Sequence, residues 1–327
     1  MVKKFKIWDS FMNMPEYGVV LGIIGLLAIL AVATGGDWFT VNTFKSIFKT
    51  SATLGLIAIG QALLITGGEI DLSVGSVYAF IGLIYAWIIK ALIPIGSVPG
   101  LLLAFLITMA VGLAIGLFHA VLVTRLNIPS LIATLGSLFI FRGIANGIGK
   151  GWGLPFPKGA RMNVLSGILG ESGFRGFNIS ILWLIIITII FSVVLSYTRY
   201  GNRLQAVGRD PITALSVGIS PAKVKLTAFL IAAALASFAA MLDIADTKYA
   251  YSAGGQGFPL ESIAAAVLGG CVVVGGGIGS IWGTVLGVFL LSSVRTGLIM
   301  MGAPPYWYIT FVGIVLILMM LIKMKRR

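Results

Sequence analysis

The sequence predicts an all-α membrane protein that crosses the bilayer about ten times. Of its 327 residues 58% are hydrophobic and only 10% are charged, and the mean hydropathy is +1.06. Soluble domains carry about 25% charged residues, so this composition excludes a soluble fold. Glycine, with 43 residues, far exceeds its usual share of about 7%. Abundant glycine is typical of membrane helices that pack closely.

Ten apolar stretches approach or exceed the roughly 17 to 25 residues that a spanning helix needs. They are residues 19–34, 44–66, 71–90, 98–124, 130–148, 179–198, 223–245, 260–276, 279–298 and 306–323. We therefore expect one transmembrane domain over residues 1–327, with residues 1–18 and 199–222 on the cytoplasmic side. Small residues four apart, as at Gly112 and Gly116 and at Ala232, Ala236 and Ala240, are expected to form packing seams.

The basic residues predict how the chain is threaded. With ten spans and the N-terminus inside, 13 bases lie on the cytoplasmic side, as the positive-inside rule requires. The outer loop at 149–178 carries four more, which weakens this bias. The net charge of +13 thus indicates a topology with both termini in the cytoplasm, and no nucleic-acid binding is expected.

The first span could also be a secretory signal, with Ala31-Val32-Ala33 as its cleavage site. We expect residues 1–33 to be retained, because the segment before the span is long and carries Asp9 and Glu16. Cleavage would also leave an odd number of spans.

Two glycine-rich breaks interrupt the apolar runs, one from Ile65 to Ser76 and the other from Leu268 to Ser280. Paired interruptions in corresponding parts of a chain predict a transporter built from two related halves with broken helices, whose substrate path lies between them. Candidates for the path and its gating are Gln61, Gly67, Gly68, Asp71, Ser73, Gly269, Gly270, Gly275 and Gly276.

The cytoplasmic segment at 199–222 predicts a short helix at the membrane surface. Asp210 followed by Pro211 is a favourable helix start, and Gly218 is placed to end the helix two turns later. A helix flanked by bases at this position is expected to dock a partner.

Three motifs resemble the permease subunits of ribose-type ATP-binding cassette importers, over residues 40 to 322. They are Thr66-Gly67-Gly68-Glu69-Ile70-Asp71-Leu72-Ser73-Val74-Gly75-Ser76, Ala206-x-Gly208-x-Asp210-(x)3-Ala214-(x)3-Gly218-Ile219, and Leu268-Gly269-Gly270-(x)4-Gly275-Gly276-(x)2-Gly279-Ser280-(x)2-Gly283-Thr284. Two positions depart from the family pattern, because Asp210 replaces the usual Asn and Glu69 stands where many members have a shorter or neutral sequence.

The resemblance implies a homodimer or heterodimer of permeases in the plasma (inner) membrane of a prokaryote. It also implies two cytoplasmic ATP-binding subunits and an extracytoplasmic binding protein that delivers a monosaccharide, ribose-like or another simple sugar. ATP and Mg²⁺ are then bound by the partner subunits, and this chain carries no cofactor of its own. Coupling to the ATPase is expected at Gly201, Ala206, Gly208, Asp210, Ala214, Gly218 and Ile219.

Several polar residues have two interpretations. Asp71 is expected to cap the following helix, although it could contact the path. Glu69 is expected to be solvated at the cytoplasmic side, the alternative being a buried proton carrier. His119 and Cys271 are expected to be buried packing residues. Gln61, Arg142, Asn146 and Arg295 are expected to face the bundle interior or its edge.

Two other functions are open from the residues. A self-sufficient secondary transporter could couple sugar to protons through Glu69 and Asp71. An intramembrane enzyme needs a nucleophile and base or a set of metal ligands, and a chain with one histidine and one cysteine offers little for either. We expect no catalytic residue and no metal site, and the sequence does not specify the sugar.

Overall fold

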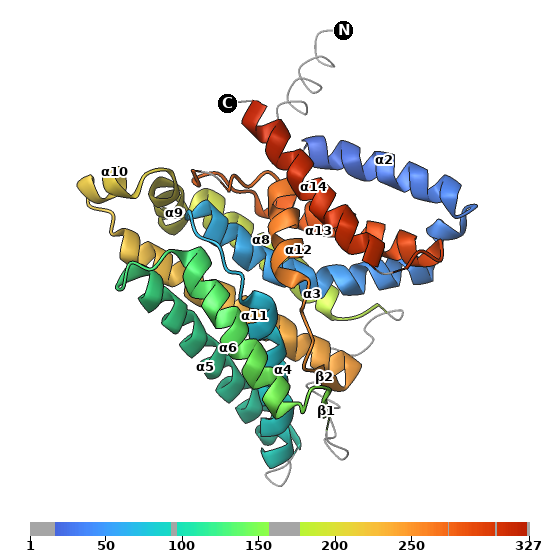
Figure 1. Ribbon diagram of the computed structural model, residues 1–327, viewed down its shortest axis with the longest axis horizontal. Helices are drawn as coiled ribbons and strands as arrows, with labels where there is room; N and C mark the ends of the chain where they lie inside the picture. The colour runs from blue at the N-terminus through green and yellow to red at the C-terminus, as the bar shows by residue number, and fades with distance from the viewer. Residues whose placement is uncertain (1–16, 93–96, 157–176, 274, 305, 326–327) are drawn as a thin grey trace.

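The computed structural model describes residues 17–92, 97–156, 177–273, 275–304 and 306–325. It is almost entirely helical (Figure 1), which confirms the predicted class of a helical protein that spans the membrane several times. Within these ranges seven helices are long and apolar enough to cross a bilayer. They are α3 (Val41–Thr66), α4 (Val74–Leu92), α5 (Ser97–Thr124), α6 (Ser130–Ile148), α8 (Ser180–Tyr197), α11 (Pro221–Thr247) and α13 (Ile281–Met300).

Three further apolar helices are α2 (Tyr17–Ala33), α12 (Phe258–Leu268) and α14 (Tyr306–Lys325). The span predicted at 260–276 is wrong in its length. The stretch 260–276 is largely apolar, yet its helix is only 11 residues long and ends at Leu268. The reason is the pair Gly269 and Gly270, which caps the helix and starts a segment whose described residues, 269–273 and 275–280, are not helical.

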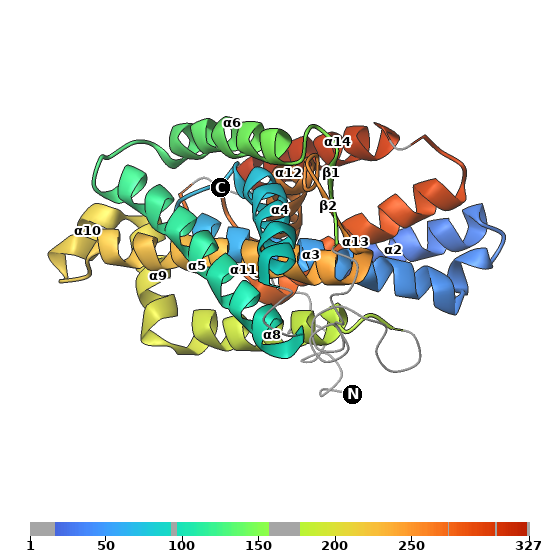
Figure 2. The ribbon, with the colours of Figure 1, turned by 90° about the horizontal axis from the view of Figure 1, so that it is seen from below.

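Helix α3 is the centre of the bundle and packs against α8, α11, α12 and α13 (Figure 2). Small residues bring the neighbouring helices close to it. A Cβ on Gly60 would lie 2.9 Å from the Cα of Ala232 on α11. On the other side of α11, a Cβ on Gly116 of α5 would lie 2.7 Å from the Cβ of Ala233. The predicted glycine and alanine seams therefore hold α11 between α3 and α5.

The predicted surface segment contains two helices, of which the sequence indicated only the second. Helices α9 (Arg199–Arg209) and α10 (Pro211–Ser216) project together from one end of the bundle, which we call the tip (Figures 1 and 2). Asp210 caps α10 as predicted and accepts bonds from the backbone amides of Ile212 at 2.9 Å and Thr213 at 3.2 Å. Gly218 follows the helix with φ +82°, a conformation that suits glycine.

Away from the tip lies a small element that the sequence did not predict. Strand β1 (Gly153–Pro155) pairs antiparallel with β2 (Tyr249–Tyr251), with Leu154 opposite Ala250. The pairing joins the chain after α6 to the chain after α11, on the opposite side of the bundle from α9 and α10 (Figure 1). The one-turn helix η1 (Asp37–Phe39) connects α2 to α3.

Candidate functional site

The two predicted breaks have the same backbone geometry. At the end of α3, Gly68 has φ +81° and the amide of Glu69 donates to the carbonyl of Leu64 at 2.9 Å. At the end of α12, Gly270 has φ +105° and the amide of Cys271 donates to the carbonyl of Ala266 at 2.9 Å. Both are Schellman caps, which satisfy the last carbonyls of a helix and need glycine at the left-handed position.

After the first cap the chain continues to Ser73 without helical hydrogen bonds. Two of its backbone amides donate hydrogen bonds to side-chain hydroxyl groups of α6. The amide of Ile70 donates to Ser130 Oγ at 3.3 Å, and that of Leu72 donates to Thr134 Oγ1 at 3.0 Å. Non-helical backbone at membrane depth requires such partners. Sequence reasoning missed both hydroxyls, although their spacing of four residues on one apolar helix is a usable signal.

Asp71 holds the start of α4. Its Oδ1 accepts from the amide of Ser73 at 2.7 Å and from the Ser73 hydroxyl at 2.6 Å, one residue before α4 begins. His119 lies beside this pair, with Nε2 3.4 Å from Ser73 Oγ and Nδ1 3.9 Å from Asp71 Oδ2. His119 is buried, as predicted. The arrangement fits the structural interpretation of Asp71.

Glu69 is not solvated, contrary to the prediction. Its side chain is buried, and its Oε1 accepts a bond of 2.5 Å from Lys225 Nζ. Lys225 lies in the second turn of α11, 156 residues later in the chain, so proximity in the sequence gave no hint of the pair.

The two breaks and α9 meet at one point, the break junction, formed by Thr66, Gly68, Gly208, Gly276 and Gly277. The amide of Gly277 donates to the carbonyl of Thr66 at 2.8 Å, so the second break is bonded to the end of α3. A Cβ on Gly208 would overlap that same carbonyl oxygen and would lie 2.6 Å from the amide nitrogen of Gly277. The last turn of α9 therefore contacts both breaks directly.

At the tip, a groove of about 390 Å³ lies between α9 and α10. Ala206, Asp210 and Ala214, three of the residues predicted to couple to an ATPase, line this groove. Two others face the bundle, because Gly201 packs on the last turn of α8 and Gly208 on the break junction. The tip also exposes three apolar side chains, Ile212 by 80%, Leu215 by 61% and Val217 by 70%, and Val217 lines the groove as well. Hydrogen bonds from Thr213, first from its hydroxyl, lower the pKa of Asp210 below its usual value.

The ends of the predicted segment are also fixed. The amides of Gly218 and Ile219 donate to the carbonyls of Leu215 and Ala214, both at 3.0 Å, so the turn after α10 is closed by its own backbone. Gly218 and Ile219 thus lie where the predicted helix ends.

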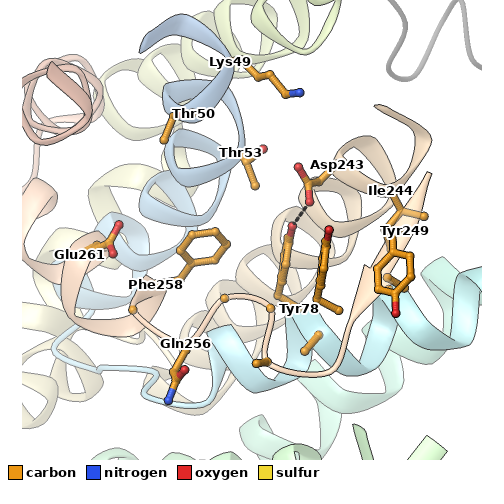
Figure 3. Close-up of a pocket in the computed structure, with 18 of the residues that line it drawn as sticks. Lys49, Thr50, Thr53, Tyr78, Asp243, Ile244, Tyr249, Gln256, Phe258 and Glu261 are labelled. Carbon is orange, nitrogen blue, oxygen red and sulfur yellow. Dashed lines mark hydrogen bonds between the residues drawn. The ribbon is translucent and has the colours of Figure 1, made fainter. Parts of the chain in front are cut away.

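Toward the opposite end of α3 is a cavity of about 500 Å³ (Figure 3). Side chains from α3, α4, α11, α12 and α13 and from the segment after α11 point into it. Its charged lining residues are Lys49, Asp243, Glu261 and Arg295, and its aromatic ones are Tyr78, Tyr249, Tyr251 and Phe258. The cavity thus offers hydrogen-bond donors, acceptors and ring faces together.

The cavity wall is held by polar contacts between helices. The hydroxyl of Tyr78 on α4 donates to Asp243 Oδ2 of α11 at 2.6 Å (Figure 3), and Lys49 of α3 pairs with Asp246 of α11. Arg142 of α6, predicted to face the bundle interior or its edge, is half-buried and donates to the carbonyls of Ser252 and Gly254 at 2.8 and 3.0 Å. Arg142 therefore fixes the segment between β2 and α12.

None of the predicted path residues lines this cavity. Gly67, Gly68, Asp71 and Ser73 belong to the first break, and Gly269, Gly270, Gly275 and Gly276 to the second. Gln61 is buried inside α3, and Cys271 is buried as predicted.

The sequence does contain one signal for the cavity, which was missed. It is a polar face of α3 formed by Ser46, Lys49, Thr50 and Thr53, whose spacing places all four side chains on one side of the helix. Groups of three or more metal-ligating side chains are absent from the described part of the chain.

A bundle of spanning helices with two matched breaks, an internal polar cavity and a surface tip that contacts the breaks defines a membrane permease. The chain matches, over residues 43–320, the family described as branched-chain amino acid transport system / permease component, and it belongs to that family. It is a permease subunit of an ATP-binding cassette importer.

Individual relatives cover nearly the whole chain. The autoinducer 2 import system permease protein LsrC of Yersinia enterocolitica is 31% identical over 97% of this chain and 84% of its own length. The ribose import permease protein RbsC of Escherichia coli strain K12 is 29% identical over 93% of each chain. The inner membrane ABC transporter permease protein YjfF of the same strain is 29% identical over 96% of this chain and 92% of its own length.

Proposed function

We propose that this permease imports a monosaccharide or a close relative of one, without catalysing a reaction itself. The polar cavity is part of the solute path, and the two breaks form the gate on the side of the tip. Carboxylates, basic side chains and ring faces in one cavity suit a solute that carries several hydroxyl groups. The printed names of two relatives, which refer to ribose and autoinducer 2, support small polar solutes of this kind.

The observation that carries the proposal is the contact of Gly208 with both breaks. The groove and the exposed apolar side chains of the tip suit docking by a protein on the cytoplasmic side. Force applied there reaches the break junction through α9, which packs on it. We infer that two ATP-binding subunits dock at the tips of a permease dimer and that a binding protein delivers the sugar at the cavity side.

This arrangement requires the tip in the cytoplasm, and with it both termini of the chain. The bases Arg199, Arg203 and Arg209 of α9 and Lys223 and Lys225 of α11 all lie at this end, as the positive-inside rule expects. The cavity then faces the outside of the cell.

The test is to isolate the tagged chain from its native membrane and to measure uptake of labelled D-ribose and a panel of other pentoses and hexoses. We expect an ATP-binding subunit to co-isolate and uptake to stop when ATP is depleted. An isolated chain without such a subunit, with uptake indifferent to ATP, would refute the proposal.

A second experiment tests the alternative of proton coupling. If the chain couples sugar to protons by itself, proteoliposomes that contain only this chain should concentrate a sugar on a pH gradient, and the double variant Glu69→Gln with Asp71→Asn should abolish that uptake. The pairing of Glu69 with Lys225 makes a free proton carrier at this position unfavourable.

A further inference from the structure

Among the described residues, one lysine–carboxylate ion pair attaches the first break to another helix, and that helix is α11. Glu69 is exposed by only 8%, and its carboxylate bonds Lys225 Nζ at 2.5 Å. The neighbouring attachments of the break to α6 are neutral hydroxyl bonds of 3.3 and 3.0 Å. Charge-assisted hydrogen bonds are about twice as strong as neutral ones, so the bond to Lys225 is the strongest single bond of these three.

Lys225 is also connected to the tip through a short, closed turn of the chain. Four residues separate α10, which ends at Ser216, from α11, which begins at Pro221. The turn between them is closed by the backbone bonds from Gly218 and Ile219, and Ser220 caps α11 by accepting from the amide of Lys223. A displacement of α10 therefore moves the first turns of α11 with it.

We propose that the Glu69–Lys225 ion pair is a coupling link that makes the first break follow α11 when the tip moves. It acts as a pair of positioning residues and does not contact the solute. This inference rests on the proposed function, since the motion it transmits comes from an ATP-binding subunit docked at the tip. It gives a role to Glu69, the charge by which this chain departs from the family pattern.

The opposite end of α11 supports this assignment. Asp243, 18 residues after Lys225, bonds Tyr78 of α4, and Asp246 pairs with Lys49 of α3. At 1.5 Å per residue the two sets of contacts lie about 27 Å apart along one helix. A single helix thus joins the first break to the wall of the cavity, so both can respond to one movement.

The test uses the complete importer in its native membrane and needs no knowledge of the sugar. A cysteine reporter is placed in the first break by I70C, in a C271S background that removes the single natural cysteine. The probe is a maleimide, and its rate of reaction with this cysteine is measured twice, once without nucleotide and once after the importer is trapped with ADP and vanadate. With the ion pair intact, we expect the two rates to differ about fivefold or more. A factor of about five is the lower end of the effect that one site of a protein usually has on another.

Four variants distinguish coupling from folding. E69Q and K225M should each bring the ratio of the two rates close to one, and the charge swap E69K with K225E should restore it. The double variant E69Q/K225M removes both charges, so no charge is left buried without its partner. If the link is what matters, the double variant still lacks the nucleotide response while its melting temperature recovers.

K223M is the matched control, because Lys223 is an exposed lysine two residues before Lys225 in α11 and has no carboxylate within ion-pair distance among the described residues. It should keep the response. A response that persists in E69Q and in E69Q/K225M, or that returns in the double variant, would overturn the inference. If no ATP-binding subunit co-isolates with the unaltered chain, the proposed function fails instead.

Discussion

Gly208, in the last turn of α9, lies so close to the end of α3 that a Cβ at this position would overlap the carbonyl oxygen of Thr66. That oxygen already accepts the amide of Gly277 from the second break at 2.8 Å. Three segments from distant parts of the sequence therefore share one carbonyl group, and only glycine fits beside it.

Replacing Gly208 with alanine should separate α9 from the break junction. Because the obstructing atoms belong to the backbone, they cannot rotate away, and overpacking of this kind costs about 1–3 kcal/mol. We expect a lower melting temperature and a severe loss of ATP-driven uptake. Gly25→Ala in α2 is the control, since its Cβ would meet nothing within 4 Å; equal loss in both variants would contradict the assignment.

Asp210 should make the start of α10 sensitive to acid. Its carboxylate accepts bonds from the Thr213 hydroxyl at 2.5 Å and from the amides of Thr213 and Ile212, and these bonds lower its pKa below the usual 3.8. The cap is therefore complete above about pH 4 and is lost as the pH falls through the lower, folded-state pKa. Hydrogen exchange of the Ile212 and Thr213 amides between about pH 5 and pH 2 measures this loss.

Asp210→Asn should abolish that pH dependence while keeping the cap, because asparagine caps helices about as well as aspartate. Asp210→Ala and Gly218→Ala should reduce uptake more than they reduce the amount of folded protein in the membrane. Unchanged acid sensitivity in Asp210→Asn would show that another group titrates.

Tyr78→Phe should loosen the cavity wall. The change removes the donor that bonds Asp243 at 2.6 Å and leaves a largely buried carboxylate without it, at a cost of about 1–3 kcal/mol. We expect thermal unfolding at a lower temperature together with reduced uptake. The matched change Tyr306→Phe, at a residue 64% exposed on α14, should alter neither property.

Arg142→Met should release the segment between β2 and α12. Two hydrogen bonds from the guanidinium group to the carbonyls of Ser252 and Gly254 are lost, and bonds to charged groups contribute about 1.5–3 kcal/mol. Limited proteolysis should cut residues 252–257 faster in this variant. Lys90→Met, which removes a charge from an exposed position at the end of α4, should leave the cutting rate unchanged.

The spanning helices could be predicted because each one is a long apolar run. The span expected at 223–245, for example, lies within α11, which covers Pro221–Thr247. Helix α10 could be predicted because Asp210, Pro211 and Gly218 mark its ends locally. The half-length of α12 could not, because composition does not distinguish a short helix with an apolar loop from a full span.

The site was predicted only in part. The breaks were found from their glycines, and their shared cap geometry follows from the same residues. The cavity was missed because its walls come from five helices and one connecting segment, and no single stretch of sequence contains it. The partner of Glu69 was missed for a related reason, since Lys225 is brought to it only by the packing of α11 against α3.

Helix α3 lines the cavity with Thr50 and Thr53 and ends at the break junction with Thr66. One continuous helix therefore belongs to both ends of the molecule. If a solute in the cavity and a protein docked at the tip each bind one position of this helix more tightly than another, thermodynamic linkage requires that each change the affinity of the other by the same factor. In the proposed orientation, filling the cavity would then change how tightly a cytoplasmic partner binds the tip.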